Sequence, residues 1–106
     1  MTENNMDLNL IIHERARLVL LTALANSEGN KLSFNELKVL SDLSSGNLSI
    51  QMKNLEEAGY ITIQKSFVNK RPQTLVLLLE KGRYALEEYL DQMESILKTI
   101  KEGINK

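Results

Sequence analysis

The hydrophobic positions of this chain recur every three or four residues near both ends and alternate in between. Apolar side chains return with the helical period from residue 8 to about residue 27, and this pattern predicts a first helix. The segment is apolar over much of its circumference, so we expect a central scaffold helix. Turn-forming residues at positions 26–30 then predict its end.

A short second helix is predicted over residues 34–40. Ser33 is placed to cap its start, and Glu36 three residues later completes a capping box. Residues 31–33, just before it, are typical of a short extended piece. The side chains expected to point inward share the helical spacing, and they are Phe34, Leu37 and Leu40.

The stretch from Ser44 to Gly59 predicts the helix around which the chain is organised, with Ser44 as its N-cap and Gly59 as a left-handed closing residue. Leu48, Met52 and Leu55 fall at i, i+4 and i+7 and predict one buried face. The other face is short-chained and polar, then cationic, with Gly46, Asn47, Ser49, Ile50 and Lys53. Small polar side chains let a helix start approach phosphates and base edges. Two short helices joined by about four residues favour a helix-turn-helix, and an ordinary amphipathic helix is the alternative.

The pattern after this helix alternates and predicts two strands, at residues 60–65 and 74–79, that pair as a hairpin. Its tip is expected at residues 69–73, where Pro72 cannot interrupt the pairing of the strands. The tip carries Lys70 and Arg71, which serve either as solubilising charge or, beside a helix-turn-helix, as contacts to phosphate or the minor groove. We favour the second interpretation.

A last, long helix is predicted from residue 80 to about residue 102. Its apolar stripe consists of Leu86, Tyr89, Leu90, Met93, Ile96, Leu97 and Ile100. About 22 residues make a helix about 33 Å long, and we expect the distal half of the stripe to stay uncovered within one chain. An exposed apolar patch of this kind marks an interface, so we expect a two-fold dimer rather than a ligand pocket.

Composition limits the class of protein. The 106 residues suffice for one small domain, and no apolar run is long enough to span a membrane. The N-terminus is acidic and polar, unlike a signal peptide, and there is no cysteine for disulfides or thiolate metal sites. We therefore expect a cytoplasmic protein with no membrane partner. Residues 1–7 are expected to be a disordered tail, residues 8–79 the DNA-binding unit and residues 80–106 the dimerisation helix.

The charge balance counts against DNA binding, because a nucleic-acid binder is usually basic and this chain has a net charge of −1 and a pI of about 5.8. The distribution is more informative than the sum. Residues 44–75 carry four cations, Lys53, Lys65, Lys70 and Arg71, against the two acids Glu56 and Glu57. The positive charge is thus local and modest.

Candidate chemistry is sparse. His13 is the single histidine, and position 17 is Arg where a zinc-protease motif needs a second ligand, so we expect a structural role, no metal and no cofactor. Arg17 lies in an apolar helix and needs a carboxylate or carbonyl partner. We favour a structural ion pair over contact with DNA. No nucleophile with a base, paired carboxylates or glycine-rich phosphate loop is evident, so we do not expect an enzyme.

Six local strings, in this order and spacing, resemble small single-domain winged-helix transcriptional regulators of the MarR/ArsR-like superfamily. The strings are residues 12–18, 33–37, 46–49, 55–60, 65–67 and 71–74, within a match from about residue 10 to residue 90. The resemblance implies a mainly α fold with a small β-hairpin, that is, a winged helix-turn-helix with a long C-terminal dimerisation helix.

It also implies a homodimeric regulator of double-stranded DNA, expected to be a repressor at a pseudo-palindromic operator. The recognition helix, residues 44–58, would enter the major groove, and the basic wing, residues 66–73, would flank it. The DNA contacts implied by the resemblance are Ser45, Asn47, Ser49, Ile50, Lys53, Lys70 and Arg71, and we expect Ser33 and Lys65 to contact DNA as well. Ile50 is apolar on a polar face, where it meets a thymine methyl or is simply exposed.

The chain departs from the family pattern at three positions. Asn54 replaces a common cation, Gln51 stands where His is frequent, and Leu79 replaces a Thr cap. A winged-helix module that binds protein instead of DNA therefore stays open, supported by the acidic pI and by Ile50. Tyr84 and Tyr89 flank a junction at which a small effector could bind, but no motif identifies one.

Overall fold

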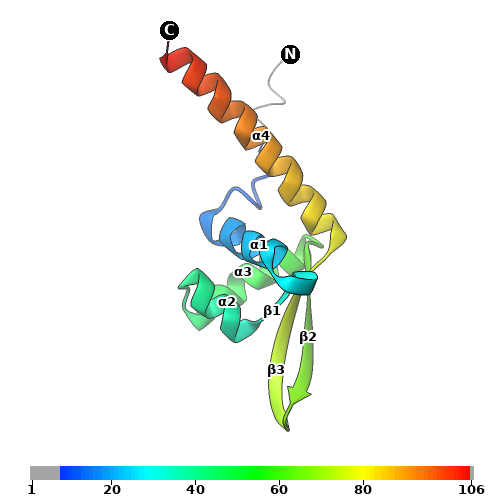
Figure 1. Cartoon of the computed structure of the whole chain (residues 1–106). Helices are drawn as coiled ribbons and strands as arrows, with labels where there is room; N and C mark the ends of the chain where they lie inside the picture. The colour runs from blue at the N-terminus through cyan, green and yellow to red at the C-terminus, as the bar shows by residue number, and fades with distance from the viewer. Residues whose placement is uncertain (1–7, 106) are drawn as a thin grey trace.

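The structure, a computed structural model, describes residues 8–105, so the tail expected at residues 1–7 lies outside it. Its helices surround one end of a small sheet, and a long last helix leaves the domain on the side opposite the hairpin (Figure 1). The elements are α1 (Arg15–Asn26), the 3₁₀ helix η2 (Glu28–Asn30), β1 (Lys31–Ser33), α2 (Phe34–Ser41), α3 (Ser45–Glu57), β2 (Ile61–Val68), β3 (Arg71–Leu78) and α4 (Glu80–Ile104).

Helix α1 begins later than the apolar pattern predicts, at Arg15 rather than at residue 8. The side chain of Asn9 accepts hydrogen bonds from the backbone N–H groups of Ile11 and Ile12, at 2.9 and 3.2 Å. An Asn that binds nearby backbone in this way competes with the helix. Glu14 then caps α1 by accepting from the backbone N–H of Arg17 at 3.0 Å. Ile12 is fully buried although it lies before the helix, so an apolar residue at this position made the predicted helix too long at its start.

Helix α2 confirms the predicted capping box. The hydroxyl of Ser33 accepts from the backbone N–H of Glu36 at 3.1 Å, and the Glu36 carboxylate accepts from the backbone N–H of Ser33 at 2.8 Å. Leu37 is buried and Phe34 half-buried, but the inward position predicted for Leu40 is wrong, since it is 60% exposed. The inward face continues instead to Ser41, and consecutive helical residues point about 100° apart.

Helix α3 confirms the predicted buried face, since Leu48, Met52 and Leu55 are all in the core; we call these three side chains the buried row. Ser44 caps the helix by accepting from the backbone N–H of Asn47 at 3.1 Å. Gly59 has φ +81°, the left-handed conformation expected of a closing glycine. Sequence-local signals therefore place this helix correctly at both ends.

The sheet has three antiparallel strands in the order β1-β3-β2, and the hairpin of β2 and β3 is longer than predicted. Its tip is only Asn69 and Lys70, whose φ values of 53° and 65° are those of a type I′ turn. Pro72 is therefore not in the tip but in β3, opposite Phe67.

Pro72 is tolerated in the strand because of the register. Residues that flank a two-residue turn, here Val68 and Arg71, form a hydrogen-bonded pair, so the next pair, Phe67 and Pro72, is non-hydrogen-bonded. The backbone nitrogen of Pro72 therefore faces away from β2, and the pairing of the two strands does not need the N–H group that proline lacks. Strand β1 pairs only with residues 75–77 and does not reach this level.

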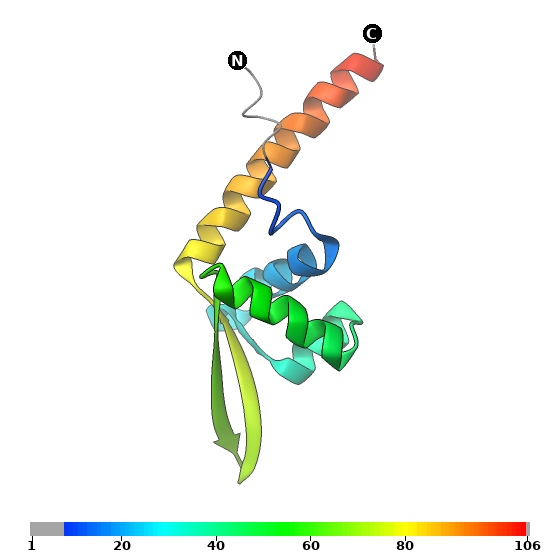
Figure 2. The same ribbon diagram turned by 180° about the vertical axis from the view of Figure 1, so that it is seen from behind.

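Helix α4 packs on the core with its first half and projects away with its second, as both views show (Figures 1 and 2). Leu86 and Tyr89 are 3% and 2% exposed within a single chain, which corrects their assignment to a dimer interface. The apolar side chains that remain at least partly exposed are Leu90, Met93, Ile96, Leu97 and Ile100. No helix among residues 8–105 has the length and apolar character to cross a membrane.

Candidate nucleic-acid interface

The outward face of α3 is open. Ser45, Asn47, Ser49, Ile50 and Lys53 are all exposed, and Ile50 is 61% exposed. At about 100° per residue, Ile50 and Lys53 lie opposite the buried row, while Asn47 and Ser49 occupy opposite flanks. Gly46 has no atom within 4 Å of the place where a Cβ would lie. The first turn of α3 therefore presents bare backbone and short polar groups, which allow the close approach of a large ligand.

The hairpin is the most uniformly charged element of the chain. Residues 58–79 contain the cations Lys65, Lys70 and Arg71 and no acid, although the whole chain has a net charge of −1. All three cations are exposed. The hairpin extends beyond the helices (Figure 1), so its tip can reach along a ligand that α3 contacts.

A groove of about 330 Å³ lies between the start of α2 and the hairpin. Its lining includes Ser33 and Asn35 on one side and Arg71 and Gln73 on the other. The start of α2 and the cation Arg71 both line this groove, and both favour an anion such as a phosphate. Ser33 itself is 8% exposed and its hydroxyl caps α2, so we expect it to stabilise the helix rather than to contact DNA. Asn35, which sequence analysis missed, is the exposed polar side chain there.

Arg17 has different partners from the ion pair we favoured. Its Nε donates to the backbone carbonyl of Ile11 at 2.6 Å and its Nη1 donates to Oε1 of Gln51 at 2.8 Å. Within residues 8–105 it forms no ion pair with a carboxylate. The side-chain NH₂ group of Gln51 donates in turn to Oδ1 of Asn47 at 3.0 Å. Sequence analysis predicted a carbonyl partner correctly but missed this link from α1 to the outward face of α3.

The segment before α1 is tied to the junction with α4 by two phenol hydroxyls. His13 Nδ1 lies 2.6 Å from the hydroxyl of Tyr89, and Asn9 Nδ2 donates to the hydroxyl of Tyr60 at 2.7 Å. His13 thus has the structural role that we expected. Within residues 8–105, no three His, Cys, Asp or Glu side chains are grouped so that they could hold a metal ion.

The helices α2 and α3, with the outward face of α3 open, are followed by the hairpin of β2 and β3 and by the long helix α4. This order of elements defines the winged helix-turn-helix class. A family model described as a winged helix DNA-binding domain matches residues 16–97, and the chain belongs to this family. The winged helix-turn-helix fold class predicted from the sequence is therefore confirmed.

The chain is similar to a protein known from its sequence and to several solved structures. An uncharacterized protein of Methanocaldococcus jannaschii, MJ0432, is 36% identical over 67 residues, which cover 63% of this chain and 73% of that protein. A transcriptional regulator homologue from Pyrococcus horikoshii superposes with a TM-score of 0.79 and 22% identity, covering 92% of this chain and 94% of the other.

One similar structure was solved in complex with DNA. It is Sco3205, a MarR family transcriptional regulator from Streptomyces coelicolor, with a TM-score of 0.66 and 20% identity. The similarity covers 97% of this chain and 74% of that chain. At this identity the likeness establishes a shared fold.

Proposed function

We propose that this chain is a DNA-binding transcriptional regulator that acts as a homodimer and represses by blocking polymerase. The observation that carries the proposal is the pairing of an open α3 face with a hairpin whose charged side chains are all cationic. In helix-turn-helix proteins the second helix lies in the major groove. The Sco3205 structure in complex with DNA, which shares the fold over 97% of this chain, supports this assignment.

In the proposed complex each element has a separate task. Ser45, Asn47, Ser49 and Ile50 meet base edges and nearby phosphates in the major groove, and Ile50 contacts a thymine methyl. Lys53 and the wing cations Lys65, Lys70 and Arg71 neutralise phosphates or enter the minor groove. Phosphate contacts position the protein, whereas base contacts select the sequence.

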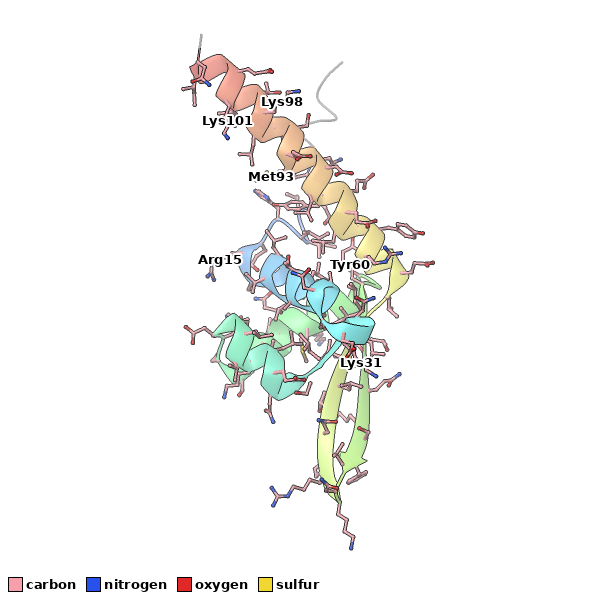
Figure 3. All side chains as sticks on the ribbon, in the orientation of Figure 1. Arg15, Lys31, Tyr60, Met93, Lys98 and Lys101 are labelled. Atoms are coloured by element: carbon pink, nitrogen blue, oxygen red, sulfur yellow. The ribbon has the colours of Figure 1, made fainter. Side chains whose placement is uncertain are left out.

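The second half of α4 provides the proposed dimer contact. Leu97 and Ile100 are 51% and 50% exposed, and Leu90 is exposed on the same stripe. Lys98 and Lys101 mark the part of α4 that projects away from the domain (Figure 3), whereas Met93 still packs against the core. A second copy of the helix covers such a stripe by two-fold packing. Two recognition helices then meet half-sites about 34 Å apart on a pseudo-palindromic operator.

The test is a fluorescence-anisotropy titration of the protein against mixed-sequence duplex and against the DNA upstream of its own gene. We expect binding that weakens with salt and is tighter on the upstream duplex, since released counterions produce the salt dependence. Equal weak binding to both duplexes would support DNA binding and would show that the operator is not in the upstream duplex. Absence of binding at every salt concentration overturns the proposal.

A protein-binding winged-helix module is the second candidate. The observation that favours it is the set of exposed apolar side chains around the helix-turn-helix, Val39, Leu40 and Ile50. This function predicts a dimer that does not bind duplex DNA. It is excluded if alanine at Lys70 and Arg71 abolishes DNA binding while the fold is retained.

A further inference from the structure

A chain of three hydrogen-bonding side chains runs from α1 to the outward face of α3. Arg17 on α1 donates to Gln51, and Gln51 donates to Asn47 one turn earlier on α3, at 2.8 and 3.0 Å. Arg17 is held at a second point by the carbonyl of Ile11 at 2.6 Å. Arg17 and Gln51 are half-buried, whereas Asn47 is exposed in the first turn of α3. This series of hydrogen bonds therefore ends at the proposed DNA interface.

The direction of every bond in this chain follows from the chemistry of Arg17. A guanidinium has donors and no acceptor, so the oxygen of Gln51 must face it. The NH₂ group of Gln51 then points to Asn47, whose oxygen must accept. The NH₂ group of Asn47 is the last donor of this series of hydrogen bonds, and it donates no hydrogen bond within residues 8–105. The orientation of an exposed amide is thus set from another helix.

We propose that Arg17 is a positioning residue that holds Asn47 with its N–H donors turned toward the DNA. This inference rests on the proposed function. Asn47 then recognises a hydrogen-bond acceptor, either a phosphate oxygen or the acceptor edge of a base, such as guanine N7 and O6 or thymine O4. The usual Asn contact with adenine uses the amide as donor and acceptor together. That mode is disfavoured here because the oxygen of Asn47 is turned back toward Gln51.

Two substitutions separate the orientation of Asn47 from other effects. Arg17→Met keeps an apolar stem in the half-buried site but removes the donors, so the amides of Gln51 and Asn47 become free to turn. Gln51→Glu keeps an acceptor for Arg17 but offers Asn47 an acceptor as well. The NH₂ group of Asn47 then turns inward and its oxygen outward. Gln64→Glu makes the same change from amide to carboxylate at an exposed position of β2 and is the matched control.

The first measurement needs no DNA. Side-chain amide resonances of Gln51 and Asn47 in the folded dimer are compared by NMR for the native protein and for Arg17→Met. We expect both amides to shift while the side-chain amide of Gln64 on β2 keeps its resonance. Unchanged Gln51 and Asn47 resonances overturn the inference, whether or not the protein binds DNA. The failure of the proposed function and the failure of this inference are therefore distinguishable.

The second measurement selects duplexes from a random pool and titrates salt. The native protein should favour guanine or thymine at one position per half-site. Arg17→Met should lose about five- to tenfold of that preference, the lower end of the range expected for one base contact. Gln51→Glu should shift the preference toward the donor-bearing adenine or cytosine, whereas Gln64→Glu should only lower affinity overall.

The remaining outcomes identify the acceptor and the role of Arg17. If Arg17→Met weakens all duplexes equally with an unchanged salt slope, the acceptor for Asn47 is a phosphate oxygen, because a neutral amide releases no counterion. If the slope falls by about 0.9 per half-site and base preference is unchanged, Arg17 contacts a phosphate directly. That result overturns the positioning role. Thermal unfolding of each variant verifies that the fold is retained.

Discussion

The backbone carbonyl oxygen of Tyr60 lies so close to Gly82 that a Cβ on Gly82 would come within 2.3 Å of it. The same oxygen accepts a hydrogen bond from the backbone N–H of Leu79 at 2.9 Å. Tyr60 follows the glycine that closes α3, and Gly82 lies in the first turn of α4. This contact therefore couples the direction in which α4 leaves the domain to the end of α3.

Replacing Gly82 by Ala should force this contact apart. Overpacking of a tight contact costs about 1–3 kcal/mol, so we expect Gly82→Ala to lower the free energy of unfolding, measured by urea denaturation, by about 2 kcal/mol. Gly103→Ala is the matched control in the same helix, because nothing lies within 4 Å of its Cβ position. Alanine is the better helix former, so we expect that control to be neutral or slightly stabilising. Equal effects at both positions would contradict the role of Tyr60.

A charge on the exposed stripe of α4 should dissociate the proposed dimer. Leu97→Glu places a carboxylate in the apolar contact, where an unpaired charge is costly. We expect the dissociation constant, measured by sedimentation equilibrium, to rise at least about tenfold, which corresponds to about 1.4 kcal/mol. Thr99→Glu adds the same charge on the opposite side of the helix and should leave the dimer intact. A dimer that is insensitive to Leu97→Glu would place the interface elsewhere.

The wing cations should affect all DNA sequences alike. Lys70→Ala combined with Arg71→Ala is expected to weaken binding to every duplex and to reduce the salt slope by about 0.9 for each phosphate that the two side chains neutralise. Anisotropy titrations at several salt concentrations measure both quantities. Lys101→Ala, near the far end of α4 (Figure 3), removes an exposed cation away from the hairpin and should leave the slope unchanged. A selective loss on one sequence would indicate base contact instead.

Ser33 should matter for stability and not for DNA. Ser33→Ala removes the side-chain acceptor from the capping box of α2, and loss of an N-cap costs about 1 kcal/mol. We expect that decrease in the free energy of unfolding by urea denaturation, together with an unchanged salt slope for DNA binding. Ser33→Asp retains a capping acceptor and should restore most of the stability. A reduced slope for Ser33→Ala would return Ser33 to the set of DNA contacts.

Local signals in the sequence were sufficient to locate α2, α3 and α4 along the chain, although not to assign every buried side chain. The buried row of α3 follows from helical spacing, the capping box from two residues three apart, and the end of α3 from one glycine. Each of these features depends on neighbours within about one or two helical turns. Such interactions join residues that are close in the sequence, so they can be predicted without knowing any long-range contact.

The features that sequence analysis missed depend on partners distant in the chain or on register. Arg17 meets Gln51 across 34 positions, and His13 meets Tyr89 across 76. Pro72 fits into β3 because the turn at Asn69 and Lys70 sets the pairing, and Leu86 is covered only when α4 packs on the core. Short-range periodicity, caps and turns therefore specify the elements and the open face of α3. The packing of these elements decides which side chains are buried and which way the amide of Asn47 points, because those properties arise from contacts between elements.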